Sequence, residues 1–369
     1  MLSKAHTLLV SVFISLFFAQ ATEGAKPKVF WSGFAFKGMD SELRVRYPHT
    51  YSLNEIKDDI RILNKYFNEY FSDNRSKFIR INLEFGVADF DEETLALSLV
   101  MTDEQVLNEK LGDIYKSVIQ LGFELIVLDF KKLEVVCSQP IFIEYRDASR
   151  KPFSDNQIQE RIQSMVAGSK SQLAEVLASK MQSIQILANN QGTLRVKEVL
   201  IGEKVKPFLP KKYTQGAIYN QIVAQQFGLL MASEGQVAML PYSKDKSNAS
   251  MSLVFSDGSL VQFKIPEPTF AIDLNLRGFK KVQSKKTAAE ALWVYGAFLD
   301  VKVYEPEFEV DFFNQQVKYG VQKIVPVSQK AVDEFPVVSE ALKGVCVQAI
   351  GLMKKDKKTK EKVLKKCKY

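Results

Sequence analysis

Few residues in this 369-residue chain suit catalysis, and histidine is the scarcest of them. Of the two histidines, His6 lies in an apolar N-terminal leader, so the mature protein keeps only His49. One histidine excludes a metal site with several imidazole ligands and allows at most one Ser–His or Cys–His pair. His49 lies in the proline-containing aromatic segment 46–51, which favours a structural or partner-binding turn over a general base. We therefore expect no metal and no cofactor.

Three short motifs resemble those of the penicillin-recognising serine enzymes: Ser243–Lys246, Ser154–Asn156 and Lys286–Ala288. That chemistry needs its serine at the start of a buried helix, with the lysine one turn later. Ser243 instead follows a predicted strand and enters a polar loop, and the S-D-N motif precedes it in the chain. The motifs are interpreted as chance matches.

Carboxylates are the only plentiful acid–base groups of the mature chain. The cluster Asp89–Glu93 has oxygens for a hard cation, but it lacks the spacing and glycine of a calcium loop, so a solvated turn is the better interpretation. Gly168–Ser171 lacks the upstream glycine of a P-loop. A carboxylate-dependent periplasmic hydrolase remains the alternative to a non-catalytic protein, although no acid pair can be chosen from sequence.

The first 21 residues have the three parts of a secretory signal peptide. Lys4 supplies the positive charge, Thr7–Phe18 is apolar, and Ala19-Gln20-Ala21 fits the cleavage site. A retained N-terminal anchor is the alternative, but no basic flank follows Ala21. We expect a periplasmic or secreted protein, which excludes nucleic-acid partners and most nucleotide chemistry.

The positive charge lies almost entirely at the C-terminus. The net charge is +7, and residues 354–369 contain nine lysines against Asp356 and Glu361. Such a lysine-rich tail attracts an anionic membrane surface or an acidic cell-wall polymer. The alternative is a solubilising helix end, because cations are favourable at a helix C-terminus.

The three cysteines are too few for a disulfide-stabilised domain, so a hydrophobic core must provide the stability. Cys137 is expected to be a buried thiol. Cys346 and Cys367 either form a disulfide between a helix and the tail or stay reduced. Asn74 and Asn248 fit the glycosylation pattern, which matters only in a eukaryotic secretory pathway.

The residue pattern predicts an α+β protein with two units. Residues 28–148 show a strand at 29–36, a helix at 56–71 after the capping box 52–55, and two strands at 79–87 and 95–101. A second capping box at 102–105 predicts a helix through Ile119, and two further strands follow. This order is that of a ferredoxin-like split β-α-β domain.

Residues 149–183 are predicted to form a helical connector to a second mixed α/β domain at 184–353. That domain has a strand at 194–201, a helix at 216–233, and a hairpin whose turn is Asp257-Gly258. Two long alternating strands at 270–279 and 293–304 and a last helix at 330–353 complete it. Residues 354–369 are the tail.

In one part of the second domain, a helix leads into the strand Val237-Ala238-Met239-Leu240-Pro241-Tyr242, and strands at 272–278 and 298–304 follow. This part resembles the α/β domain of the curli-secretion and penicillin-binding-protein-activator families. The resemblance covers about residues 213–319. It implies a non-enzymatic assembly or activator role in the bacterial envelope. The chain departs from those families because it has no lipid-anchor cysteine and inserts the 257–258 hairpin.

These features predict an exported, non-catalytic binding or assembly protein of the bacterial cell envelope. Its partner would be an envelope protein or a cell-wall component. A membrane-surface protein tethered by the basic tail is a further alternative. The expected contact residues are Trp31, Tyr47, His49 and Tyr51 near the entry loop, and Lys354, Lys355, Lys357 and Lys358 in the tail.

Overall fold

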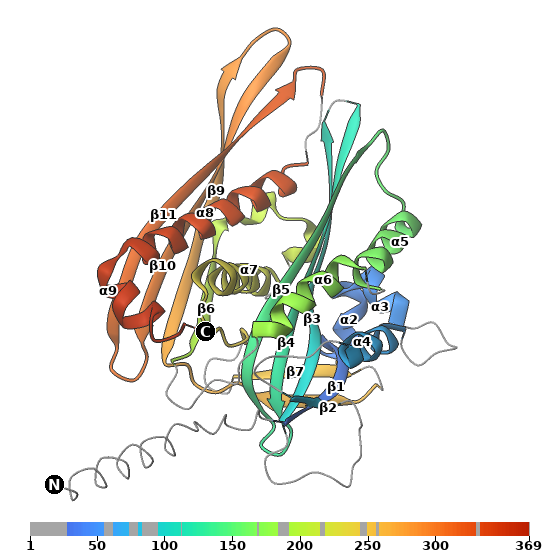
Figure 1. Ribbon diagram of the computed structural model, residues 1–369. Helices are drawn as coiled ribbons and strands as arrows, with labels where there is room; N and C mark the ends of the chain where they lie inside the picture. The colour runs from blue at the N-terminus through green and yellow to red at the C-terminus, as the bar shows by residue number, and fades with distance from the viewer. Residues whose placement is uncertain are drawn as a thin grey trace, which may run out of the picture.

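The computed structural model describes residues 28–368 apart from 55–61, 74–79, 83–94, 112, 168–169, 184–191, 215–217, 244–248, 256–257 and 330–332. The predicted signal peptide, the acidic cluster 89–93, and the glycosylation positions Asn74 and Asn248 lie outside the described residues. The α+β class is confirmed: helices and mixed parallel and antiparallel sheets alternate along the chain (Figure 1).

The first sheet has seven strands in the order β2-β1-β3-β4-β5-β8-β7. It comprises β1 (Lys28–Lys37), β2 (Arg80–Asn82), β3 (Leu95–Leu111), β4 (Ile114–Asp129), β5 (Glu134–Ser149), β7 (Ser250–Phe255) and β8 (Leu260–Lys264). The sheet curls until β7 pairs antiparallel with the end of β1. The β7–β8 hairpin was predicted in the second domain, so strands from both sequence units build this sheet.

Helices from the N-terminal half cover one face of the first sheet. They are α2 (Asp40–Arg46), α3 (Pro48–Asn54), α4 (Ile62–Asp73), α5 (Asp155–Val166) and α6 (Gln172–Ser183). The last two form the predicted connector. Ile158, Ile162 and Leu177 are buried against the sheet, so α5 and α6 belong to its core.

The second sheet has the order β11-β10-β9-β6, where β6 (Leu194–Lys204) is parallel to β9 (Phe270–Lys286). Strands β10 (Glu290–Glu305) and β11 (Val310–Pro326) complete it. Helices α7 (Ile218–Gly235) and α8 (Phe335–Lys355) pack on it in one large apolar cluster. Short turns η2 (Lys206–Phe208) and η3 (Lys211–Tyr213) precede α7. Strands β6, β9 and β10 and helices α7 and α8 were predicted correctly in type and order, whereas β11 was not predicted.

Among the helices of the described chain, only α8 has the length and the apolar composition that a membrane-spanning helix needs. Its apolar side is buried: Val338, Leu342 and Val345 are at most 1% exposed. It is therefore placed as a core helix between β10–β11 and α7.

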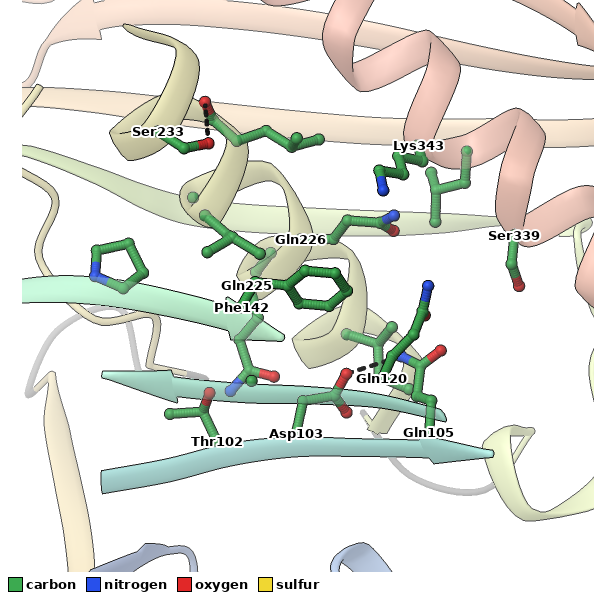
Figure 2. Close-up of a pocket in the computed structure, with 18 of the residues that line it drawn as sticks. Thr102, Asp103, Gln105, Gln120, Phe142, Gln225, Gln226, Ser233, Ser339 and Lys343 are labelled. Carbon is green, nitrogen blue, oxygen red and sulfur yellow. Dashed lines mark hydrogen bonds between the residues drawn. The ribbon is translucent and has the colours of Figure 1, made fainter. Parts of the chain in front are cut away.

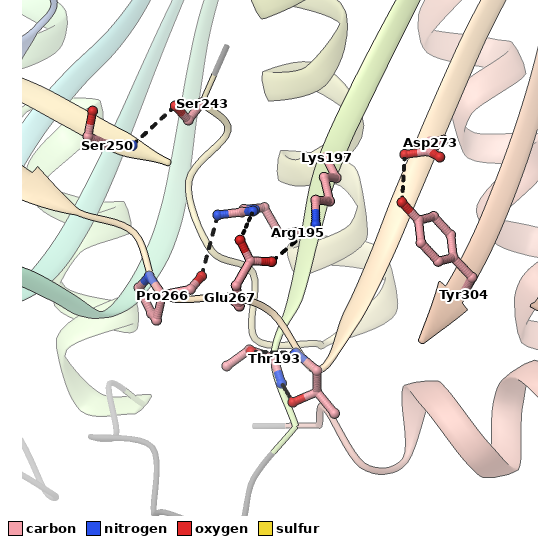
Figure 3. Close-up of polar contacts among 10 residues, drawn as sticks. Thr193, Arg195, Lys197, Ser243, Ser250, Pro266, Glu267, Asp273 and Tyr304 are labelled. Carbon is pink, nitrogen blue, oxygen red and sulfur yellow. Dashed lines mark hydrogen bonds and ion pairs between the residues drawn. The ribbon is translucent and has the colours of Figure 1, made fainter. Parts of the chain in front are cut away.

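A buried arginine fixes the crossing between the two sheets. Arg195 on β6 is 1% exposed, and its guanidinium donates to the Pro266 carbonyl and pairs with Glu267 at 3.4 Å (Figure 3). Lys197 pairs with the same carboxylate at 3.2 Å. These contacts hold the 265–269 connection, in which the chain passes from the first sheet to the second.

The predicted ferredoxin-like topology is wrong for residues 102–122. There the chain forms one long antiparallel hairpin, with Leu111 paired to Ile114, in place of a helix. Alternate side chains enter different layers: Ile119 joins the cluster under α2–α6, while Leu107 and Val118 join the one under α7 and α8. Because a strand buried on both faces is apolar on both sides, its pattern can match helical spacing.

The first capping box is also placed differently. Helix α3 starts at Pro48, a residue favoured at the first helical position, and Ser52 lies inside the helix with its hydroxyl bonded to the His49 carbonyl at 2.7 Å. His49 is thus helical, not in a loop.

The lysine-rich tail folds back onto the body. It forms α9 (Lys357–Thr359) and the π-turn η4 (Lys360–Leu364), with Val363 fully buried and Leu364 7% exposed. Lys358 donates to the Asp311 carbonyl at 2.5 Å, and its ammonium lies 5.2 Å from the Phe312 ring centroid. Cys137, Cys346 and Cys367 are all buried, and among the described residues no disulfide joins Cys346 of α8 to Cys367 of the tail.

Gly202 marks the tightest backbone contact in the second sheet. A Cβ added there would lie 2.4 Å from the Arg277 carbonyl oxygen, beside an irregularity in the β6–β9 ladder. We expect Gly202→Ala to lower the free energy of unfolding by about 2–4 kcal/mol, measured by urea denaturation. Gly351→Ala in α8, where a Cβ meets nothing within 4 Å, is the control and should gain up to about 1 kcal/mol. Equal stability of the two variants would contradict this packing.

Candidate functional site

A cavity of about 630 Å³ lies between the first sheet and the helices α7 and α8. Strands β3, β4 and β5 supply one wall, α7 the opposite wall, and α8 one side (Figure 2). Helix α6 contributes Lys180. This volume is within the usual range for small-molecule sites, about 300–1,000 Å³. The cavity is the candidate site.

The sheet wall combines apolar and polar side chains through strand alternation. Asp103, Gln105 and Leu107 on β3 line the cavity, and their partners Gly122, Gln120 and Val118 on β4 line it beside them. Phe142 on β5 completes the wall. The residues between them face the other way and enter the core under α2–α6.

A β-bulge at Thr102 places two consecutive side chains of β3 on the cavity. Met101 pairs with Phe123 and Asp103 with Gly122, so Thr102 is the extra residue. A bulge aims side chains differently from a regular strand, and bulges are common beside functional sites. The Thr102 carbonyl accepts from the Arg46 guanidinium at 3.2 Å. Gly122 keeps the wall open, since a Cβ there would lie 3.2 Å from Asp103 Cβ.

Buried charges gather at the bulge end of the cavity. Burial raises the pKa of Asp103 to about 6, and the Gln105 amide donates to its carboxylate at 2.8 Å. Glu124 lines the same end, and Ser138 donates to its carboxylate at 3.2 Å. Burial lowers the pKa of Lys37, whose ammonium donates to the Tyr242 carbonyl at 3.2 Å while the charge of Glu124 opposes that shift.

Glu104, between these cavity residues in sequence, has a different role. Its carboxylate lies on the opposite face of the sheet and accepts from the backbone N–H groups of His49 and Thr50 at 3.0 and 2.9 Å. Burial raises the pKa of Glu104, and these hydrogen bonds oppose that shift. It therefore caps the start of α3.

Two buried polar atoms on α7 have no hydrogen-bond partner within the described part of the chain. They are the Tyr219 hydroxyl and the Gln225 amide nitrogen, and both residues line the cavity. Tyr219 is 3% exposed, and burial raises the pKa of its hydroxyl. Unpaired buried polar groups cost free energy, so these two atoms lower the stability of the fold beside the cavity.

Cations lie on another side of the cavity. Lys343 on α8 points toward Gln226 and has its ammonium 5.5 Å from the Phe142 ring centroid (Figure 2). Lys180 is half-buried, and burial lowers its pKa. Arg146 forms an ion pair with Glu144, a carboxylate that also accepts from Gln120 at 2.6 Å.

The predicted contact residues are not part of this cavity. Trp31 and Tyr47 are 4% and 0% exposed, so the expectation that they form an exposed surface is wrong: they pack in the core under α2–α4. Tyr51 and His49 are half-buried in α3. The tail lysines Lys354, Lys355, Lys357 and Lys358 are exposed, although Lys354 donates to the Glu234 carbonyl at 2.7 Å.

The sequence contained a signal for the site that the periodicity obscured. Gly112-Asp113 stands between two long runs free of proline, and a Gly-Asp pair is typical of a two-residue hairpin. The polar run 102–105, interpreted as a helix start, supplies cavity residues instead. Within the described residues, no cluster of histidine, cysteine and carboxylate side chains is arranged to bind a metal.

No family model matches the chain, and no curated protein matches it. Solved structures with some likeness include a neuraminyllactose-binding hemagglutinin homolog from Helicobacter pylori, at 11% identity and TM-score 0.28 over 48% of this chain and 91% of that one. Another is a hypothetical protein from Chlamydia trachomatis, at 7% identity and TM-score 0.26, covering 44% of this chain and 96% of that one. A minor lipoprotein from Acinetobacter baumannii has 11% identity and TM-score 0.23, with 42% and 89% covered. At these TM-scores the likeness supports no inference about function.

The raised pKa of Asp103 lowers the free energy of unfolding by an amount that depends on pH. Its carboxyl titrates at 3.8 when unfolded and near 6 when folded, so the cost is full above pH 6 and disappears as the pH falls toward 4. We expect Asp103→Asn to stabilise the fold most at pH 7.5, by up to about 3 kcal/mol relative to its effect at pH 4. Urea denaturation across this range measures it.

Asp113→Asn, which removes an exposed carboxylate from the tip of the same hairpin, controls for net charge. A stability difference between Asp103→Asn and the wild type that stays constant from pH 4 to 7.5 would contradict the raised pKa of the half-buried Asp103.

Proposed function

We propose that the protein is an exported, non-catalytic binding protein of the bacterial envelope that holds an elongated amphipathic molecule in the cavity under α7 and α8. The observation that supports this most is a cavity of about 630 Å³ whose lining combines apolar side chains with the amide of Gln226 and the ammonium of Lys343. A bound molecule would fill this space and pair with these polar groups.

The lining suggests the chemistry of the ligand. Leu107, Val118 and Ile222 offer an apolar path, and amide side chains from β3, β4 and α7 line the same space. Lys343 and Lys180 favour an anionic oxygen-rich head, because a cation in a partly desolvated wall gains by pairing. A long-chain carboxylate or a similar lipid fragment fits these features.

The envelope location rests on the predicted signal peptide at 1–21 and on the resemblance to curli-secretion and penicillin-binding-protein-activator proteins. Such a protein would keep an envelope lipid or lipid-like molecule out of water, or bind it as a signal for an envelope partner.

The test is a titration of the mature chain with a fluorescent long-chain carboxylate and with its methyl ester. We expect one site. Lys343→Gln should weaken binding of the carboxylate probe about fivefold or more and leave the affinity for the ester within twofold of the wild type. Gln226→Leu should weaken the binding of both probes about fivefold, since a lost hydrogen bond is worth about 1 kcal/mol.

Gly228→Leu blocks the site by volume. A Cβ at Gly228 meets only Met239 Cε, at 3.7 Å, so α7 tolerates a side chain that projects into the cavity. Gly228→Leu should abolish binding of both probes, whereas Lys151→Gln on the exposed surface should leave binding unchanged. Binding that survives in Gly228→Leu would contradict the cavity as the site.

A carboxylate-dependent hydrolase is the second candidate, favoured by Asp103 and Glu124 in one cavity wall. An acid with a pKa of about 6 suits a general acid near neutral pH. Mass spectrometry of the methyl ester after incubation separates the two functions. We expect intact ester; hydrolysis that both Asp103→Asn and Glu124→Gln abolish would instead support the enzyme.

A further inference from the structure

Strands β9, β10 and β11 extend beyond the helices that cover the second sheet. Past α8 they form a three-stranded ribbon, which projects at the top of Figure 1 beside the tip of the β3–β4 hairpin. All residues from Val282 to Glu290 are exposed. This end of the ribbon therefore has no packing partner among the described residues.

Four apolar side chains lie on the outer face of the ribbon. Val282 pairs directly with Val294, and Leu292 pairs directly with Ile324. Paired residues share a face, and Leu292 and Val294 are two positions apart, so the four side chains lie together. Val282 and Ile324 are 46% and 56% exposed. A contiguous exposed apolar patch is typical of an interaction surface.

Lysines surround this patch. Lys280 and Lys285 are the ladder partners of Gly296 and Leu292, which places them on the outer face, and Lys286 follows at the turn. All three are exposed, and none is within ion-pair distance of a carboxylate in the described structure. We call Lys280, Val282, Lys285, Lys286 and Ile324 the ribbon tip.

The β3–β4 hairpin adds a second projection of the same kind. Its tip presents Ile114, 49% exposed, and it is fixed to the ribbon by a Lys323–Glu109 ion pair at 2.6 Å. Gln329 also donates to the Lys110 carbonyl at 2.9 Å. The two projections are thus held as one unit.

We infer that the ribbon tip docks on an anionic lipid surface. Lysines attract anionic headgroups, and exposed apolar side chains among them insert at the boundary of headgroups and acyl chains. The positive charge without paired carboxylates is complementary to such a surface. The lysine-rich tail lies at the opposite end of β10 and β11, against Asp311 and Phe312, so the two basic regions can be tested separately.

The experiment is co-sedimentation of the mature chain with vesicles of phosphatidylglycerol and phosphatidylethanolamine. We expect binding that falls with added salt and is absent on phosphatidylcholine vesicles. The triple variant K280Q/K285Q/K286Q should bind at least tenfold more weakly, since each lysine near an anionic surface contributes about fivefold. V282S/I324S should also lose binding, with an unchanged unfolding midpoint as the check on folding.

The matched control is K355Q/K357Q/K362Q, which removes the same charge from exposed tail lysines. It should bind within twofold of the wild type. The inference would be overturned if the ribbon and tail variants lost vesicle binding equally, or if only the tail variant lost it. It would also be overturned if the wild-type protein did not bind anionic vesicles but bound a second copy or another protein through the ribbon. The inference stands on the ribbon and is independent of the ligand in the cavity.

Discussion

The burial of the β3–β4–β5 sheet on both faces is the constraint on which the rest of the structure depends. One face packs on α2–α6 and the other faces α7 and α8, so each strand must place apolar side chains on both sides. The second layer does not close completely over the sheet. The remaining space is the cavity, and the residues that alternation turns toward it become its wall.

The cavity is maintained at a cost in stability. Among the described residues, the hydroxyl of Tyr219 and the amide nitrogen of Gln225 are buried without hydrogen-bond partners, and the carboxyl of Asp103 is held where burial raises its pKa. A core built for stability alone would replace such groups with apolar ones. This cost, beside an unfilled cavity lined by apolar and cationic side chains, is why we propose a binding function rather than a structural one.

Much of the fold could be predicted from the sequence, because local patterns decide it. The alternating strands at 270–279 and 293–304, the helix α7 and the β7–β8 hairpin follow from periodicity and turn residues. The site could not be predicted. Its strands are apolar on both faces, so they lack the alternation that identifies a strand. The polar residues 102–105 match the pattern of a helix start, but they form a β-bulge and part of the cavity wall. The prediction that Trp31 and Tyr47 are exposed was wrong for a related reason. The sequence around an aromatic residue near a predicted loop does not show which helices cover its side chain.

The most direct test is native mass spectrometry of the protein purified from its own cell, with the released small molecules analysed after unfolding. The account predicts a fraction of the protein that carries one amphipathic molecule with an acidic oxygen-rich head, in one-to-one stoichiometry, and none on Gly228→Leu. A protein that is always ligand-free, or a molecule retained when the cavity is filled, would contradict it.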